Sequence, residues 1–130
     1  ATAPPEVREG LLDGRNPTPE ARAAREQRVV DTALAFAEGE AGTQDLNPEW
    51  DREFMRVCAA QDTAAFDAYE AGEMAAEAGN SSHEVRGWVA AFSALGATGR
   101  YEVGYEYYRP IRHFIAGFGV MTARREDTPR

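Results

Sequence analysis

The sequence contains no lysine: all 14 basic residues are arginine, and 22 acidic residues give the 130-residue chain a formal net charge of −8. The arginines are spread along the chain and form no basic block. Phosphate backbones are bound by concentrated basic surfaces, so this distribution argues against a nucleic-acid partner. An anionic small-molecule substrate is compatible with the charge, because one well-placed arginine can bind a carboxylate locally.

Cysteine is scarce as well, since Cys58 is the only one. It cannot form an intramolecular disulfide, and its place in a helical apolar pattern predicts a small core side chain in a protein of the reducing cytoplasm. No apolar run approaches the length of a membrane span, and the opening five residues have neither the charged nor the apolar region of a targeting signal. Because the chain does not begin with methionine, we expect further residues before Ala1.

Motifs of self-sufficient active sites are also missing. The chain has no G-x-S-x-G, no phosphate-binding glycine loop and no C-x-x-C. Its two histidines, His83 and His113, would have to converge with a carboxylate from a helix start and a loop, and no spacing rule supports such a metal site. The alternative is that both are surface or packing histidines.

The residues that are present predict one domain whose first part is helical. An apolar content of 43% with 10% aromatic residues argues against intrinsic disorder. Thr18-Pro19 and Asn47-Pro48 each pair a capping residue with a proline at the first helical position. We expect an irregular arm over residues 1–18 and helices over 19–39, 48–58, 62–69, 74–78 and 81–99.

Two strands are expected after these helices. Tyr101, Val103, Tyr105 and Tyr107 alternate with other residues at the period of a half-buried strand, which Pro110 is expected to end. Residues 114–122 predict a second, more buried strand, followed by a loose charged tail from residue 123. A two-stranded sheet alone is marginally stable, so we expect the strands to join a larger sheet. The fold class is therefore α/β, with about five helices followed by two strands.

Glu84 allows two interpretations. Ser81-x-x-Glu84 before an apolar run is the pattern of a capping box, in which the glutamate returns a hydrogen bond to the start of the helix. A carboxylate at a helix N-terminus beside a deep core is also well placed to bind a metal ion, since the helix dipole keeps it ionised. The pattern favours capping but does not exclude a metal ligand.

The segment from Tyr107 to Arg109 also allows two interpretations. The rings of Tyr107 and Tyr108 could line a pocket for an aromatic acid, with the Arg109 guanidinium binding its carboxylate. Such a strand is more often core on one side and surface on the other. The Gly117-x-Gly119 pair is too short for a dinucleotide fingerprint and indicates close approach of the backbone to a neighbour.

Beyond these patterns, the chain resembles a known family in four segments. The segments are residues 22–30, 46–55 and 78–92, and a last one made of residues 107–111 and 115–119. They are ordered and spaced as in the class III extradiol dioxygenases, the superfamily of protocatechuate 4,5-dioxygenase. In that family Fe(II) is held by two histidines and one glutamate, which leaves open positions for a catechol and O2.

The resemblance implies extradiol (meta) ring cleavage of a catechol that carries a propionate or cinnamate side chain. The family glutamate lies in an Ala-Gly-x-x-x-x-Glu-x-x-x-Trp stretch, which places it at Glu84 and favours the metal-ligand interpretation. Arg109 or Arg86 could bind the propionate, and Tyr107 and Tyr108 could contact the substrate. The family's iron and acid–base histidines have no counterpart here, so neither histidine of this chain receives a role.

The resemblance therefore implies that residues 1–130 are the C-terminal portion of one catalytic domain, with residues 19–99 helical, 100–122 in strands and 123–130 as the tail. Such a chain needs an N-terminal portion or a complementary subunit to complete the iron site, and it would act in a cytoplasmic homo-oligomer. Two other function classes stay open: a noncatalytic subunit that pairs with a separate chain, and a small helical interaction domain without its own metal site.

Overall fold

The computed structural model describes residues 18–40 and 44–126. The chain divides into two units, residues 1–41 and residues 42–130. The arm expected over residues 1–18 lies outside the described residues apart from Thr18, and so does the end of the tail from residue 127.

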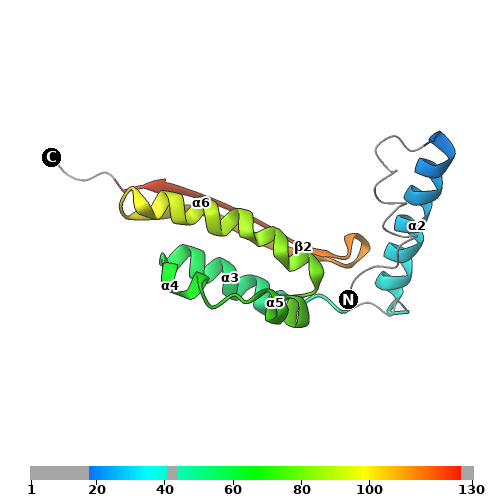
Figure 1. Ribbon diagram of the computed structural model, residues 1–130, viewed down its shortest axis with the longest axis horizontal. Helices are drawn as coiled ribbons and strands as arrows, with labels where there is room; N and C mark the ends of the chain where they lie inside the picture. Colours follow the sequence, from blue (N-terminus) through cyan, green and yellow to red (C-terminus); the bar gives the residue numbers. More distant parts are fainter. Residues whose placement is uncertain (1–17, 41–43, 127–130) are drawn as a thin grey trace. The chain divides into compact units, whose positions relative to one another are not determined.

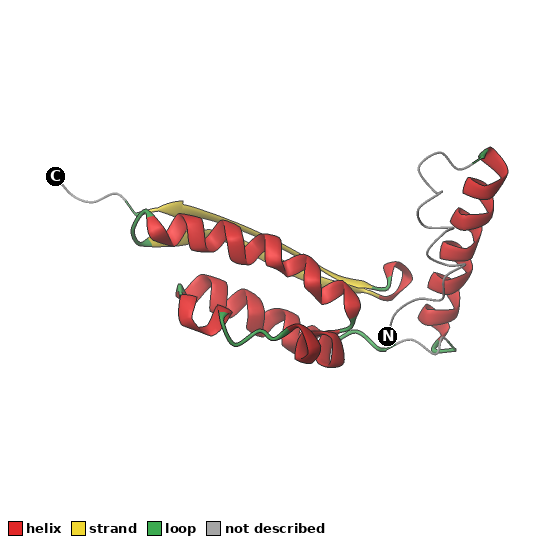
Figure 2. Ribbon diagram, viewed as in Figure 1, coloured by secondary structure: helices red, strands yellow, loops and turns green. Residues whose placement is uncertain are grey.

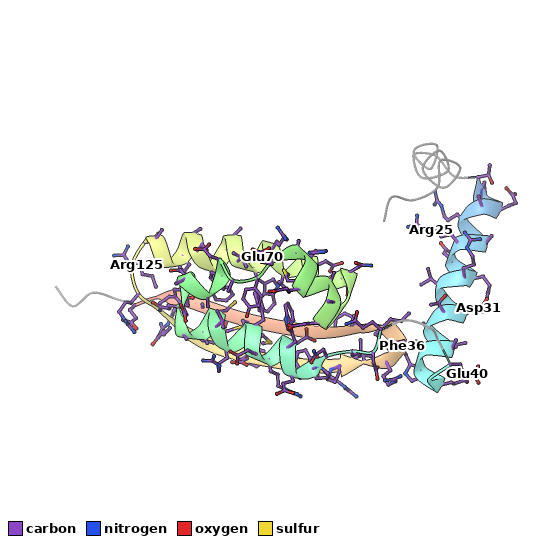
Figure 3. The ribbon with its side chains drawn as sticks, turned by 60° about the horizontal axis from the view of Figure 1, so that its bottom comes forward. Arg25, Asp31, Phe36, Glu40, Glu70 and Arg125 are labelled. Carbon is purple, nitrogen blue, oxygen red and sulfur yellow. The ribbon has the colours of Figure 1, made fainter. Side chains whose placement is uncertain are left out.

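The first unit is described through one helix, α2 (Pro19–Glu38). Thr18 begins it as predicted, because its side-chain oxygen accepts a hydrogen bond from the Ala21 backbone N–H at 3.2 Å. Gly39 ends it with a φ of 82°, a left-handed conformation that glycine adopts without strain. Phe36, which Figure 3 labels, is buried, whereas Val29 is 61% exposed.

The second unit contains four α-helices and one 3-10 helix followed by a hairpin, so the predicted order of helices before strands is confirmed over the described residues (Figure 1). Each early helix begins at the predicted capping residue: Asn47 accepts from the Trp50 N–H at 3.1 Å, and Asp62 accepts from the Ala65 N–H at 3.1 Å. The elements are α3 (Pro48–Ala60), α4 (Thr63–Phe66), α5 (Ala71–Ala78), the 3-10 helix η1 (Asn80–Val85), α6 (Arg86–Ala97), β1 (Tyr101–Ile111), the 3-10 helix η2 (Arg112–Phe114) and β2 (Ala116–Arg125).

The capping box predicted at Ser81 and Glu84 is wrong. Those residues lie inside η1, and α6 begins only at Arg86 without a side-chain cap. The Ser82 hydroxyl donates instead to the Gly79 carbonyl oxygen at 2.6 Å, which stabilises the tighter 3-10 turn. The Glu84 carboxylate therefore has no capping role.

The strands form one antiparallel hairpin (Figure 2), in which the predicted alternation of β1 is interrupted. Val103 pairs with Ala123 and Tyr105 pairs with Thr122, so Gly104 is an extra residue in a β-bulge. Because side chains alternate between the two faces of a strand, one extra residue exchanges the faces for every later position.

The hairpin is also longer than predicted at two points. Pro110 lies within β1, opposite Gly117, rather than ending the strand. This position is next to the hairpin turn, where a missing N–H donor is tolerated. β2 continues to Arg125, which Figure 3 labels, and Arg124 forms an ion pair with Glu102 across the strands.

The core lies between the helices of the second unit and one face of the hairpin. Phe54 of α3 is 2% exposed and its ring lies 6.2 Å from that of Trp88 and 5.5 Å from that of Tyr69. The Phe92 ring of α6 lies 5.6 Å from that of Tyr101 on β1. Large aromatic side chains dominate such cores because each removes a large apolar area from water.

Cys58 is fully buried in this core, as the sequence predicted. Burial raises the pKa of its thiol to about 12, so the thiol stays protonated at neutral pH and is not a nucleophile. The Tyr101 hydroxyl donates to the Cys58 carbonyl oxygen and ties β1 to the end of α3. None of the described helices is both long and apolar enough to cross a bilayer.

Candidate functional site

A cavity of about 390 Å³ lies in the second unit between α3, η1, the start of α6 and the tip of the hairpin. Apolar walls come from Phe54 and Met55 of α3 and from Trp88 of α6. Polar side chains reach it from three elements: Asp51 of α3, Glu84 of η1 and Tyr108 of β1. Its size and its few converging polar groups are typical of a small-molecule site.

Glu84 is exposed and lines this cavity. Among the described residues its carboxylate makes no hydrogen bond or ion pair, so both oxygens are available to a ligand. The 3-10 conformation of η1 follows from Gly79, whose φ is 78°, and from the Ser82 hydrogen bond. The local sequence therefore directs a carboxylate to the cavity.

Unlike Glu84, Tyr108 and Asp51 are hydrogen-bonded to each other. The Tyr108 hydroxyl donates to Asp51 Oδ2 at 2.5 Å, and the Arg52 guanidinium lies 4.9 Å from the centre of the Tyr108 ring. Burial, followed by the hydrogen bond to Asp51, raises the pKa of Tyr108 well above its ordinary value. Tyr108 is therefore a neutral phenol whose proton is directed at Asp51.

The backbone at Gly117 makes room for this pair. A Cβ atom added there would lie 2.6 Å from the Tyr108 hydroxyl oxygen and closer still to Asp51 Oδ2. At Gly119 an added Cβ would lie 3.2 Å from the Met55 sulfur and 3.4 Å from the Trp88 ring. The close approach predicted for the Gly-x-Gly pair thus brings β2 against the cavity wall.

The other residues predicted for the site lie elsewhere. Tyr107 is 43% exposed on the opposite face of β1 from Tyr108, because adjacent strand residues point in opposite directions. Arg109 is exposed and does not line the cavity. Arg86 lines a separate, smaller hollow with Tyr69. Within the described residues, the cavity brings together only Glu84 and Tyr108 of the predicted set.

The described residues by themselves do not build a metal centre. No three His, Cys, Asp or Glu side chains among residues 18–40 and 44–126 are grouped so that they could hold an ion. His83 is half-buried and His113 is exposed, and neither lines the cavity. Glu84 could provide one ligand, and the remaining ligands of a complete site would have to come from outside these residues.

Asp51 and Gly117 were not predicted as site residues. Asp51 stands in the first turn of α3, where a carboxylate ordinarily stabilises the helix start, so its pattern gave no sign of a role in a cavity. The glycine pair was the available signal, because glycines in a strand indicate a close neighbour. The identity of that neighbour depends on how the hairpin packs against α3.

Comparison with known proteins gives strong matches over nearly the whole chain. It is 61% identical over 127 residues to a 2,3-dihydroxyphenylpropionate/2,3-dihydroxicinnamic acid 1,2-dioxygenase of Rhodococcus globerulus. An enzyme of the same name from Paraburkholderia xenovorans is 51% identical over 124 residues. No family model matches the chain. The resemblance predicted from the sequence motifs is confirmed by these identities.

The matches cover 98% of this chain but only 40% of the Rhodococcus globerulus enzyme, and 95% against 39% for the Paraburkholderia xenovorans enzyme. The chain therefore spans about two fifths of the length of these relatives. This is consistent with the prediction that it corresponds to a C-terminal portion.

Proposed function

We propose that this chain is part of an extradiol dioxygenase that cleaves the ring of 2,3-dihydroxyphenylpropionate or its cinnamate analogue beside the diol. The observation that carries this proposal is the 61% identity over 98% of the chain to an enzyme named for that reaction. The cavity supports it, because it offers a carboxylate without a partner among the described residues beside an aromatic wall of suitable size.

In the proposed enzyme Glu84 binds Fe(II), with further ligands supplied from outside this chain. The iron, when bound, supplies the open coordination positions at which a catechol and O2 can meet. The chain's own residues hold Glu84 at the cavity and supply its apolar wall. Trp88, one turn after Glu84 along the chain, provides the apolar surface against which a ring can lie.

The outer face of the hairpin supports a role within a longer protein. We define this face by Tyr105, Tyr107 and Val120, which are 53%, 43% and 50% exposed. Neighbouring apolar side chains exposed on one face of a sheet suit contact with another part of a protein. Because the relatives are about two and a half times as long as the matched region, the rest of such a protein is the proposed occupant of this face.

The proposal is tested in the longer protein that contains this chain by replacing Glu84 with glutamine. Loss of one ligand oxygen is expected to reduce bound iron and to lower ring cleavage at least about 100-fold. Iron is measured by elemental analysis, and cleavage by the absorbance of the ring-opened product. Glu73→Gln is the matched control, since Glu73 is an exposed residue of α5 that does not line the cavity.

Two results would contradict the proposal. One is a wild-type protein that cleaves neither diol when loaded with iron. The other is a Glu84→Gln variant with normal iron content and activity, which would leave the contact surface as the main role of this chain and favour a noncatalytic subunit.

A further inference from the structure

Among the described residues, some polar side chains that line the cavity are already hydrogen-bonded to the protein, and others are not. The Asn47 side chain accepts from the Trp50 N–H and donates to the Glu77 carbonyl, at 3.1 and 3.0 Å. The Ser82 hydroxyl donates to the Gly79 carbonyl. These side chains line the cavity, and each already donates one hydrogen bond to a backbone carbonyl of the protein itself.

The ionisable acidic and basic side chains that line the cavity are all acidic among the described residues. Its lining includes the carboxyl groups of Asp51 and Glu84 and, among the described residues, no arginine or histidine. Such a wall repels a carboxylate and favours a ligand that brings hydrogen-bond donors or a cation. The neutral hydroxyls of a catechol fit this wall, and the propionate group of the same molecule does not.

Tyr108 adds a directed acceptor to this wall. A phenolic hydroxyl has one proton and two lone pairs, and the Tyr108 proton is committed to Asp51 Oδ2 at 2.5 Å. The lone pairs of the hydroxyl oxygen are what Tyr108 can still offer to a ligand. Donation to a carboxylate also makes that oxygen a stronger acceptor, because hydrogen bonds in a chain polarise one another.

We propose that Tyr108, oriented by Asp51, is a specificity-determining residue that accepts a hydrogen bond from one ring hydroxyl of the catechol. The inference rests on the proposed function and adds the direction of the substrate: its hydroxyl end faces the Tyr108 wall, and its carboxylate end points away from it. Gly117 supports this arrangement, since a larger residue there would displace Asp51 and Tyr108.

The test measures binding without turnover. In the longer protein, kept free of O2, the Kd of 3-(2,3-dihydroxyphenyl)propionate is followed by tryptophan fluorescence, to which Trp88 in the cavity wall contributes. Tyr108→Phe removes the acceptor and keeps the ring, and it is expected to raise this Kd about three- to tenfold. Tyr107→Phe, the same change on the other face of β1, is expected to leave the Kd unchanged.

Two monohydroxy ligands separate recognition from a structural role. 3-(2-Hydroxyphenyl)propionate and 3-(3-hydroxyphenyl)propionate each lack one ring hydroxyl. Tyr108→Phe is expected to weaken the binding of one of them and not of the other, because Tyr108 contacts a single hydroxyl. Equal weakening of both, or of neither, would overturn the inference.

Asp51 is tested by two changes. Asp51→Asn keeps an oxygen that can accept from Tyr108, so most of the diol affinity should remain. Asp51→Ala removes it and should approach the loss seen for Tyr108→Phe, since the hydroxyl is then free to rotate. Full affinity in Asp51→Ala would contradict the orienting role.

Failure of this inference is distinguishable from failure of the proposed function. A wild-type protein that binds the diol but does not cleave it with iron and O2 contradicts the proposed function. The Kd values of the wild type and Tyr108→Phe then still test the inference. A wild-type protein that cleaves the diol, together with a Tyr108→Phe variant of unchanged Kd, contradicts only the inference. A wild-type protein without affinity for the diol contradicts both.

Discussion

The two faces of the β1–β2 hairpin are built from the same strands but meet different surroundings. On the inner face, Gly119 and Met121 approach the helices and Tyr108 enters the cavity. On the outer face, Tyr105, Tyr107 and Val120 are about half exposed. The outer face thus carries large apolar side chains that the described residues leave open, whereas the inner face carries buried or core-packed side chains together with the glycines at its closest contacts.

At Gly117 and Gly119 the strand approaches its neighbours so closely that a larger side chain would have no room. Interiors are packed as densely as organic crystals, so a strand can approach a helix closely only where its side chains leave room. Gly117 and Gly119 leave that room. The outer face carries the apolar surface that a further layer would need, and three substitutions test the two faces against each other.

The largest effect is expected behind the inner face. Phe54→Ala should reduce the free energy of unfolding by about 3–5 kcal/mol, because it removes a buried ring and leaves a cavity in contact with several aromatic neighbours. Chemical denaturation of the longer protein measures it. The same change at Phe114, which is 67% exposed, should cost under about 1 kcal/mol. Similar losses at both positions would contradict the packing described here.

Gly117→Ala should have the second largest effect. The added methyl group overlaps Asp51 and Tyr108, and overpacking of this kind costs about 1–3 kcal/mol. Gly104→Ala is the matched control on the same hairpin, since its Cβ would find Thr122 Oγ1 at an ordinary 3.5 Å. Thermal unfolding compares the two variants, and equal midpoints would show that β2 does not need the close approach at residue 117.

The smallest effect is expected on the outer face. If the rest of the longer protein covers this face, Tyr107→Ala should lower the free energy of unfolding of that protein by about 1 kcal/mol, through loss of apolar burial at a side chain that is 43% exposed here. Thr122→Ala, beside it on the same face, provides a control with little apolar area. An unchanged free energy of unfolding for Tyr107→Ala would mean that the outer face stays exposed to solvent in the longer protein as well.

Local signals predicted the helices well. Thr18, Asn47 and Asp62 each cap the expected helix start, and Gly39 and Gly79 follow the expected ends. These features depend on hydrogen bonds between residues three or four positions apart and on the freedom of glycine, so the sequence contains the whole cause. The predicted capping box at Ser81 and Glu84 failed, because these residues have the right sequence spacing but lie inside the 3-10 helix η1.

The strands and the candidate site were predicted less completely. The alternation from Tyr101 to Tyr107 could not reveal the bulge at Gly104, which depends on the register of a partner strand. That single extra residue turns Tyr108 toward the cavity and Tyr107 away from it. The predictions for Arg86 and Arg109 rested on charge alone, and the structure places both outside the cavity.

The sequence by itself determined where α2, α3 and α4 begin, that Cys58 is a core residue, and that the chain resembles a part of the extradiol dioxygenases. These conclusions follow from local hydrogen bonding, apolar spacing and motif order. The tertiary structure alone decided that Tyr108 pairs with Asp51, 57 positions away, and that Gly117 makes room for the pair. The reason is physical: strand register and helix–sheet packing join residues far apart in the chain, and no local pattern fixes which of them meet.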